Sequence, residues 1–333
     1  MPRLRHPRNQ KGKNMILLTG GAGYIGSHCV KRLMSKGYEV VVLDNLSRGF
    51  RDAVVTPYFY EGDIGDREIL EKIFNEHKIE AVMHFSAFAA VGESVEHPDM
   101  YYKNNVAQTL TLVTACKDFG INNFIFSSTC ATYGDVKKVP ISEDTPIAPL
   151  NPYGWSKRMV ELILDDFSKA YGMHYCIFRY FNAAGADPEG QLRERHDPET
   201  HLIPLVLQVA KGKRQNIKVF GTDYPTPDGT CIRDYIHVDD LSDAHILGLE
   251  YLKREKKNGI FNLGSENGFS VREVIDVCRK VTGSEIPEVM VERRPGDAPK
   301  LVADSTKAKT ILGWQPKESE LEYIVETAWK SMK

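Results

Sequence analysis

The chain has 333 residues, a formal net charge of −2, 42% apolar and 26% charged residues, which is typical of a globular protein with one or two domains. A charge this close to zero favours neither nucleic acid nor a membrane surface as a partner. No apolar run approaches the ~20 residues that a membrane-spanning helix needs.

The chain begins with a basic stretch, residues 1–14, which lacks the apolar core of a secretory signal. We expect a disordered extension, or one added artificially, because Met15 opens the first predicted strand. The rival interpretation is a targeting or phosphate-binding arm. The stretch has no acidic residues, as in a transit peptide, but it has no serine either.

A glycine-rich run, Gly20-Gly21-Ala22-Gly23-Tyr24-Ile25-Gly26, lies between an apolar strand and an amphipathic helix. In this context the first glycine permits a tight turn, the one at 23 lets a pyrophosphate approach the backbone, and the one at 26 lets the helix pack closely on the sheet. The N–H groups at the helix start favour an anion. The run predicts a dinucleotide-binding loop; a glycine turn without a ligand is the plain alternative.

Asp44 ends the next predicted strand, residues 39–43, about where such loops are followed by an acidic residue. Its carboxylate can accept hydrogen bonds from both hydroxyls of the adenosine ribose and would repel a 2′-phosphate. The sequence therefore favours NAD over NADP, although Arg48 nearby weakens this preference.

Short apolar strands then alternate with helices. We predict strands over 58–64, 81–86, 123–128 and 175–182, and helices over 67–77 and 99–119 and one that runs to about residue 171. This alternation predicts a Rossmann-type, doubly wound parallel α/β sheet with both faces covered. Ligands of such sheets bind beyond the carboxyl ends of the strands, so Asp44, Asp63, residues 85–90 and residues 127–133 should line one crevice.

The chain becomes more polar and irregular after Asn182. We predict helices over 202–212, 240–253, 271–282 and 320–332, and strands over 217–220, 260–263 and 288–292. These elements suggest a smaller C-terminal α/β domain for substrate binding, residues 183–333, behind a nucleotide-binding domain of residues 15–182. The boundary is soft, because segments such as 232–263 can return to the first domain.

Tyr153 and Lys157 lie one turn apart on a predicted helix and therefore share a face. A phenol is a poor base at neutral pH, but a neighbouring ammonium and a cationic nicotinamide would lower its pKa. Together with the Thr129 hydroxyl at a strand end, the pair could remove a proton from a substrate alcohol. The alternative is an ordinary exposed helix pair.

Cysteine and histidine point to no further chemistry. The six cysteines, at 29, 116, 130, 176, 231 and 278, lie among apolar runs without C-x-x-C spacing. They predict buried, reduced thiols in a cytoplasmic protein. The histidines show no ligand spacing with one another or with cysteine, so we expect no metal.

Several ordered motifs resemble those of the extended short-chain dehydrogenase/reductase family, in particular its nucleotide-sugar 4-epimerases. They are residues 19–26, 44–45, 62–64, 91–94, 127–129, 180–185, 233–238 and Tyr153 with Lys157. The resemblance extends from residue 15 to about 331. It implies an isomerase that keeps its NAD and interconverts UDP-galactose and UDP-glucose through a 4-keto sugar. Tyr153 would be the base, Thr129 would bind the sugar 4-oxygen, and Lys157 would hold the nicotinamide ribose.

The resemblance also implies which residues bind the ligands. The cofactor would be bound by Gly20, Gly23, Tyr24, Ile25, Gly26, Asp44, Asn45, Asp63, Ile64, Phe85, Ser86, Ala87, Asn104, Ser127, Tyr153, Lys157 and Tyr180. The UDP-sugar would be bound by Thr129, Tyr153, Phe181, Asn182, His201, Leu202, Lys218, Phe220, Arg233, Arg294, Asp297 and Leu301. Without the resemblance, the two arginines would be read as surface ion pairs.

Some positions depart from the family pattern. Thr129 replaces a frequent serine and keeps the hydroxyl, whereas Ala89 replaces a lysine that some relatives place near the cofactor. His201 replaces an asparagine and either contacts substrate or simply faces the crevice. Leu301 is intermediate in size at the position that gates N-acetylated sugars, so UDP-N-acetylhexosamines stay open as substrates, as do UDP-arabinose and UDP-xylose.

Two other activities are weighed against epimerisation. A related 4,6-dehydratase would need an Asp-Glu pair after the strand-end threonine, where this chain has Cys130-Ala131. A non-catalytic dinucleotide sensor would typically have lost the tyrosine or the lysine. The resemblance further implies a homodimer through helices 99–119 and 157–171; the plain alternative is that both helices only cover the sheet.

Overall fold

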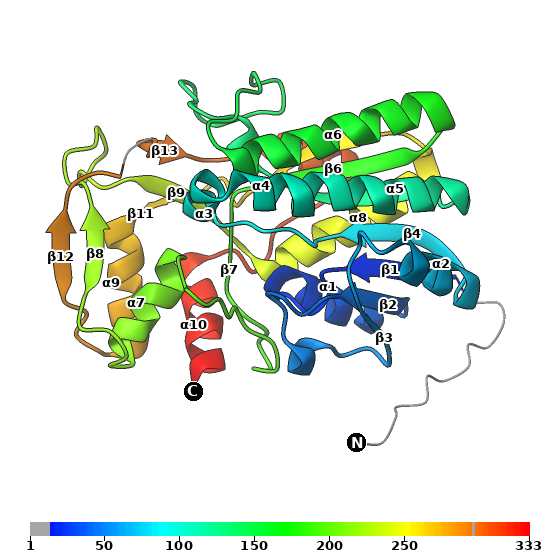
Figure 1. The fold of residues 1–333 in the computed structure, drawn as a ribbon. Helices are drawn as coiled ribbons and strands as arrows, with labels where there is room; N and C mark the ends of the chain where they lie inside the picture. Colours follow the sequence, from blue (N-terminus) through cyan, green and yellow to red (C-terminus); the bar gives the residue numbers. More distant parts are fainter. Residues whose placement is uncertain (1–13, 295–296) are drawn as a thin grey trace. The chain divides into compact units, whose positions relative to one another are not determined.

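The computed structural model describes residues 14–294 and 297–333 (Figure 1). The expected N-terminal extension lies, except for Asn14, outside the described residues. The chain divides into two compact units, one made of residues up to 132, 149–178 and 245–260, the other of residues 133–148, 179–244 and 261–333. In the part of the chain that is described, no helix is long and apolar enough to cross a membrane.

The first unit is built on a seven-stranded sheet in the order β10-β6-β5-β4-β1-β2-β3. Its strands are β1 (Met15–Thr19), β2 (Glu39–Asp44), β3 (Tyr58–Glu61), β4 (Ile79–His84), β5 (Asn123–Thr129), β6 (His174–Tyr180) and β10 (Gly259–Leu263). The pairs β1–β2, β1–β4, β2–β3 and β4–β5 are parallel. The order reverses at β1, which makes the edge beyond β1 and β4 the expected ligand crevice.

Helices cover both faces of this sheet, as predicted. They are α1 (Tyr24–Ser35), α2 (Arg67–Glu76), α3 (Val91–Glu96), α4 (Pro98–Tyr101), α5 (Gln108–Asp118), α6 (Pro152–Tyr171) and the last part of α8 (Val238–Glu255). Leu70 of α2, Leu112 of α5 and Val160 of α6 join one core with strand residues such as Leu17. On the other face the thiol of Cys29 in α1 lies 3.9 Å from the Met83 sulfur. The doubly wound α/β architecture is confirmed.

Two predicted elements of this unit differ in detail. The helix expected over 99–119 consists of α4, a π-helical turn over Tyr102–Ala107 and α5, and Figure 1 shows this segment running beside α6. The strand expected over 175–182 ends at Tyr180, and Asn182 starts a new strand. Short 3-10 turns at Arg51–Ala53 and Cys130–Thr132 were not predicted.

The second unit contains two small sheets. One is formed by β7 (Asn182–Ala184), β9 (Ile232–His237), β11 (Gly268–Ser270) and β13 (Lys300–Leu301), and the other by the parallel pair β8 (Ile217–Phe220) and β12 (Glu288–Val291). Strand β9 is central, since it pairs with β7 and β13 in parallel and with β11 antiparallel. The sequence analysis did not predict β9, β11 and β13, because β11 and β13 have only three and two residues and β9 carries the charged Arg233 and Asp234 within its apolar run.

Three helices enclose the core of this unit: α7 (Leu202–Ala210), α9 (Val271–Thr282) and α10 (Leu321–Met332). Val206, Ile275 and Ile324 are fully buried between them. The start of α9 is fixed by a capping box, in which the Ser270 side chain accepts from the Glu273 N–H and Glu273 accepts from the Ser270 N–H. A π-helical turn over Ala308–Leu312 precedes α10.

Candidate active site

The glycine loop joins β1 to α1, and two of its glycines have no room for a side chain. Gly20 has φ +76°, and a Cβ there would lie 2.6 Å from the Ser86 nitrogen. A Cβ on Gly26 would lie 2.1 Å from the Gly20 carbonyl oxygen. Gly23 is the N-cap of α1 and cannot supply a capping side chain, so the N–H groups of the first turn suit an anionic ligand.

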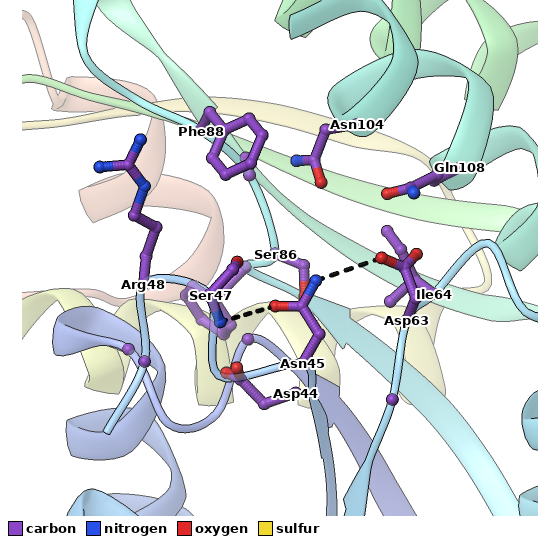
Figure 2. A pocket seen from close by; sticks show the side chains of 16 residues that line it. Asp44, Asn45, Ser47, Arg48, Asp63, Ile64, Ser86, Phe88, Asn104 and Gln108 are labelled. Carbon is purple, nitrogen blue, oxygen red and sulfur yellow. Dashed lines mark hydrogen bonds between the residues drawn. The ribbon is translucent and has the colours of Figure 1, made fainter. Parts of the chain in front are cut away.

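A pocket opens beside this loop at the carboxyl ends of β1 to β4 (Figure 2). It is lined by Gly20, Gly23, Asp44, Asn45, Ser47, Arg48, Gly49, Gly62, Asp63, Ile64, Phe85, Ser86, Ala87, Phe88, Asn104 and Gln108. Most of the predicted cofactor residues meet here. Tyr24, Ile25 and Gly26 continue the loop into α1, whereas Ser127 ends β5 and Tyr180 ends β6.

Asp44 is held at the pocket floor by the backbone around it. Its Oδ2 accepts from the Ala22 N–H at 2.9 Å and its Oδ1 from the Leu46 N–H at 2.8 Å. Burial raises the pKa of this carboxyl, and the two backbone donors oppose the rise. Each oxygen keeps a second lone pair that can accept from a ribose hydroxyl.

Arg48, which the sequence left as a possible 2′-phosphate ligand, is directed elsewhere. Its guanidinium pairs with Glu93 at 2.6 Å and lies 5.4 Å from the centre of the Phe88 ring. Figure 2 shows the side chain extending away from Asp44, with its guanidinium at about the height of Phe88. Glu93 also accepts from the Tyr101 hydroxyl at 2.8 Å. Arg48 thus binds α3, through Glu93, instead of turning toward Asp44.

The neighbouring strand ends are linked by side-chain hydrogen bonds. Asn45 donates to Asp63 at 3.1 Å and accepts from the Ser47 N–H at 3.0 Å (Figure 2). Asp63 also accepts from the Gly65 N–H at 2.8 Å. These bonds fix the carboxylate and the turn after β3, whose Asp63 and Ile64 are among the predicted cofactor contacts.

The π-helical turn and the first residue of α5 carry two residues that sequence reasoning missed, Asn105 and Gln108. Asn105 is buried and bonds both backbone groups of Phe88, accepting from its N–H at 2.9 Å and donating to its carbonyl at 3.0 Å. It also donates to the Ser156 hydroxyl of α6 at 3.0 Å. Gln108 points into the pocket (Figure 2). The widened turn is the signal, since π-helical turns cluster at functional sites.

The three proposed catalytic residues lie on β5 and α6. Asn151 caps α6 by accepting from the Gly154 N–H at 2.9 Å. A Cβ on Gly154 would lie 2.7 Å from the Ala131 carbonyl, so α6 starts directly against the turn that follows β5. Tyr153 and Thr129 therefore belong to adjoining segments.

Lys157 is almost fully buried beneath this turn. Its Nζ donates to the Ser127 carbonyl at 2.7 Å and lies 4.9 Å from the centre of the Phe126 ring. Burial lowers the pKa of Lys157 to about 7, opposed by the charge of Glu161. Glu161, also buried and missed from the sequence, accepts from Ser128 at 2.7 Å and from Arg158 at 3.0 Å. These bonds fix α6 on β5.

The proposed UDP-sugar residues belong mainly to the second unit. Arg233 on β9 donates to the Ala298 carbonyl at 2.9 Å and pairs with Asp297 at 3.3 Å. Leu301 on β13 is its register partner. Arg294 lies 4.0 Å from the centre of the Phe220 ring. The structure thus forms two groups from residues that are far apart in sequence.

The other predicted UDP-sugar residues do not belong to either of these two groups. The Asn182 amide donates to the Asp234 carbonyl at 2.9 Å, Phe181 is buried, and Leu202 begins α7. Lys218 is exposed on β8. His201 turns toward Glu194 and Glu199. The run at 293–297 includes two residues, 295 and 296, outside the described part.

Known proteins resemble this chain over nearly its whole length. The model of the "NAD dependent epimerase/dehydratase family" matches residues 16–264. A UDP-glucose 4-epimerase of Halalkalibacterium halodurans is 52% identical over 314 residues, 94% of this chain and 94% of that protein. The crystal structure of UDP-glucose 4-epimerase from Brucella ovis in complex with NAD has a TM-score of 0.93 and 48% identity, covering 96% of this chain and 98% of that one. The Bifidobacterium longum enzyme in complex with NAD⁺ and UDP has a TM-score of 0.90 and 37% identity, covering 96% and 98%.

Proposed function

Because this chain belongs to the NAD dependent epimerase/dehydratase family, we propose that it interconverts UDP-galactose and UDP-glucose by inverting C4 of the sugar, with NAD as cofactor. Curated relatives and a solved structure named UDP-glucose 4-epimerase, about half identical to this chain, cover nearly its whole length. The enzyme is an isomerase, and the reaction leaves no net oxidation or reduction.

The residues of the first unit fit NAD. The glycine loop leaves no room for side chains but suits a pyrophosphate, and Asp44 presents a carboxylate without a competing cation, because Arg48 pairs with Glu93. Asn45, Asp63 and Gln108 supply polar groups farther along the pocket. When bound, NAD accepts a hydride from C4, which leaves a 4-keto sugar, and returns it to the opposite face.

The protein residues handle the proton and the position of the sugar. We assign Tyr153 as the base that takes the 4-hydroxyl proton and later returns it. Thr129 donates a hydrogen bond to the same sugar oxygen. A positive charge on Lys157 favours the phenolate of Tyr153, and burial beside the Ser127 carbonyl holds this ammonium in one place. Such a positioned base typically contributes ~10²–10⁴-fold to rate.

The diphosphate and uridine contacts are proposed for the second unit. The guanidinium groups of Arg233 and Arg294 suit phosphate oxygens as forked donors. Asp297, already beside Arg233, suits the uridine ribose, and Phe220 suits a place beside uracil. The remaining proposed sugar or phosphate contacts are Phe181, Asn182, His201, Leu202, Lys218 and Leu301. In functional terms, residues 15–182 would serve NAD and supply the catalytic residues with Phe181 and Asn182, and residues 183–333 would supply the other UDP-sugar contacts.

The surface of α5 and α6 supports a homodimer. Trp155, Met159 and Leu162 follow one another at helical spacing on α6 and are 43%, 37% and 46% exposed, and Leu110 of α5 is 42% exposed. Adjacent exposed apolar side chains of this size mark interaction surfaces. We place the two-fold contact on these helices. A cytoplasmic location agrees with the six cysteines all being thiols.

The proposal rests above all on the start of α6 against the turn after β5, which joins the segments of Tyr153 and Thr129. The test is to incubate the purified protein with UDP-galactose, without added NAD, and to follow UDP-glucose by chromatography. Wild type should convert the sugar, and Tyr153→Phe should be slower by at least ~100-fold. Tyr171→Phe is the matched control, since Tyr171 ends the same helix on the surface.

Each outcome has a distinct meaning. No conversion by wild type, even after NAD is added, would contradict the hexose reaction. Equal rates for Tyr153→Phe and wild type would leave the reaction standing but remove Tyr153 as the base. Dependence of wild type on added NAD would show that the cofactor is not retained.

A further inference from the structure

Four side chains of one loop in the second unit converge on a common point. The loop precedes α7 and has the spacing Glu194-x-His196-x-x-Glu199-x-His201. One ligand atom from each residue lies within 4.8 Å of the other three. The proposed reaction assigns nothing to three of these residues, and the histidine spacing was not recognised as a metal-binding pattern in the sequence.

The nitrogen–oxygen distances within this His/Glu cluster are close to the edge length of a tetrahedral site. His196 Nδ1 lies 3.3 Å from Glu194 and 3.4 Å from Glu199, and His201 Nδ1 lies 3.3 Å from Glu199 and 2.8 Å from Glu194. Zinc bonds to histidine nitrogen and carboxylate oxygen of ~2.0–2.1 Å give a ligand–ligand edge of about 3.3 Å in a tetrahedron. Three of the four separations are near this value; His196 faces Oε2 of Glu199 and His201 faces its Oε1, so binding one ion requires a small rotation of this carboxylate.

The two carboxylates are buried and held in place, as metal ligands are. The Glu194 side chain is only 7% exposed and the Glu199 side chain only 6%. Glu199 Oε1 accepts from the N–H groups of Thr200 and His201 at 2.8 and 2.9 Å, which orients the group. Glu194 Oε1 is buried and accepts no hydrogen bond from the described residues, although both imidazole nitrogens are close. An ion at the centre would satisfy this oxygen.

We propose that Glu194, His196, Glu199 and His201 bind one divalent transition-metal ion of the zinc class. Two imidazoles select such an ion over Mg²⁺ and Ca²⁺, which prefer oxygen ligands. Four protein ligands leave no open position, so the site is structural. The ion ties residues 194–201 into a fixed loop at the start of α7. The site shares His201 with the proposed substrate contacts, and its other three residues take no part in the proposed reaction.

The competing arrangement is a cluster of ion pairs without metal. Burial opposes protonation of both histidines, but the two carboxylates raise the pKa of His201 to about 10 and that of His196 to about 9. In the absence of metal both imidazoles are therefore in the doubly protonated, positively charged form at neutral pH. The two arrangements differ in metal content, which decides between them.

The test uses the untagged full-length protein, stripped with a chelator and then titrated with Zn²⁺ in competition with a chromophoric chelator. Wild type should bind one equivalent. His196→Gln and Glu199→Gln should each weaken binding by at least ~100-fold, since the loss of an outer-shell partner alone costs ~10–100-fold. Asp197→Asn is the matched control, because it removes a negative charge from the same loop but no cluster atom.

Co²⁺ supplies a second measurement that does not depend on activity. Wild type and Asp197→Asn should show the intense visible absorption of tetrahedral Co²⁺, and His196→Gln, whose side chain is one-third exposed and tolerates replacement, should not. Circular dichroism verifies the fold of each variant. Failure of wild type to bind Zn²⁺ would leave the metal-free ion cluster and overturn the proposal. Binding that both cluster variants retain would place the ion elsewhere and overturn it too.

Discussion

His84 shows how a single buried residue supports the nucleotide loop. It ends β4, and its Nδ1 and Nε2 lie 2.7 Å from the Thr19 hydroxyl and 2.9 Å from the Thr109 hydroxyl. These contacts link β1, β4 and α5 directly below the glycine loop. Burial, with the nearby Lys157 charge, lowers the pKa of His84 to about 3. The His84 imidazole is therefore uncharged in the folded protein at neutral pH.

The lowered pKa predicts a loss of stability in acid. Between pH 6.5 and 3 the unfolded chain binds a proton at His84 that the folded chain does not, so the free energy of unfolding falls as pH falls, by up to about 1.4 kcal/mol per pH unit. His84→Gln removes this titration. Urea unfolding at pH 6.5 and pH 5 should show wild type losing about 2 kcal/mol more than the variant.

Exposed His97 provides the control for this experiment. His97→Gln should keep the wild-type dependence of stability on pH. Equal acid sensitivity of wild type and His84→Gln would mean that His84 is protonated in the folded state or that its loop opens in acid.

At the scale of elements, the glycine loop and α1 are packed so closely on β1 that there is no space for a side chain at Gly26. The Gly26 position allows the first turn of α1 to approach the Gly20 carbonyl, with no space for a methyl group. Gly26→Ala should push α1 away from β1, destabilise the protein by ~1–3 kcal/mol and raise the Kd for NAD at least tenfold, a loss of about 1.4 kcal/mol.

Gly92 in α3 is the matched position, since a Cβ there meets no atom within 4 Å. Gly92→Ala should bind NAD as wild type does and be slightly more stable, because alanine is the better helix former. Titration calorimetry with NAD and thermal unfolding measure both effects. An unchanged Kd in Gly26→Ala would mean that the loop can relax without losing its ligand geometry.

The sequence predicts these elements where local pattern and burial agree. Uniformly apolar strands gave the parallel sheet, and the glycine run with Asp44 gave the nucleotide pocket. Other features depend on contacts between distant segments. Strand β13, with Lys300 and Leu301, exists only through pairing with β9, and the pairing of Arg48 with Glu93 follows from the placement of α3. The His/Glu cluster spans a loop, where spacing rules for helices do not apply.

At the scale of the whole molecule, the proposed dimer can be tested through its surface. Leu162 is 46% exposed beside Trp155 and Met159 on α6. Leu162→Glu would bury a carboxylate against the partner's apolar face, which costs several kcal/mol when the charge has no partner. Sedimentation should show a dimer for wild type and a monomer for the variant.

Ile311 supplies the comparison, because it is 43% exposed in the other unit. Ile311→Glu makes the same chemical change on a segment that is not part of α5 or α6 and should leave the dimer intact. A monomeric wild type, or a dimer that survives Leu162→Glu, would contradict the assignment of these helices.

The chain passes repeatedly between the two units, and this has a consequence for synthesis on the ribosome. Strand β6 ends at Tyr180, but its sheet neighbour β10 begins only at Gly259. At ~5–20 residues per second, translation leaves β6 as an open edge for on the order of 4–15 s. During this interval the apolar Ile177 and Phe178 belong to an unfinished sheet, and an unpaired strand of this kind is open to association with other chains. Completion of the nucleotide-binding sheet therefore waits for most of the second unit to be made.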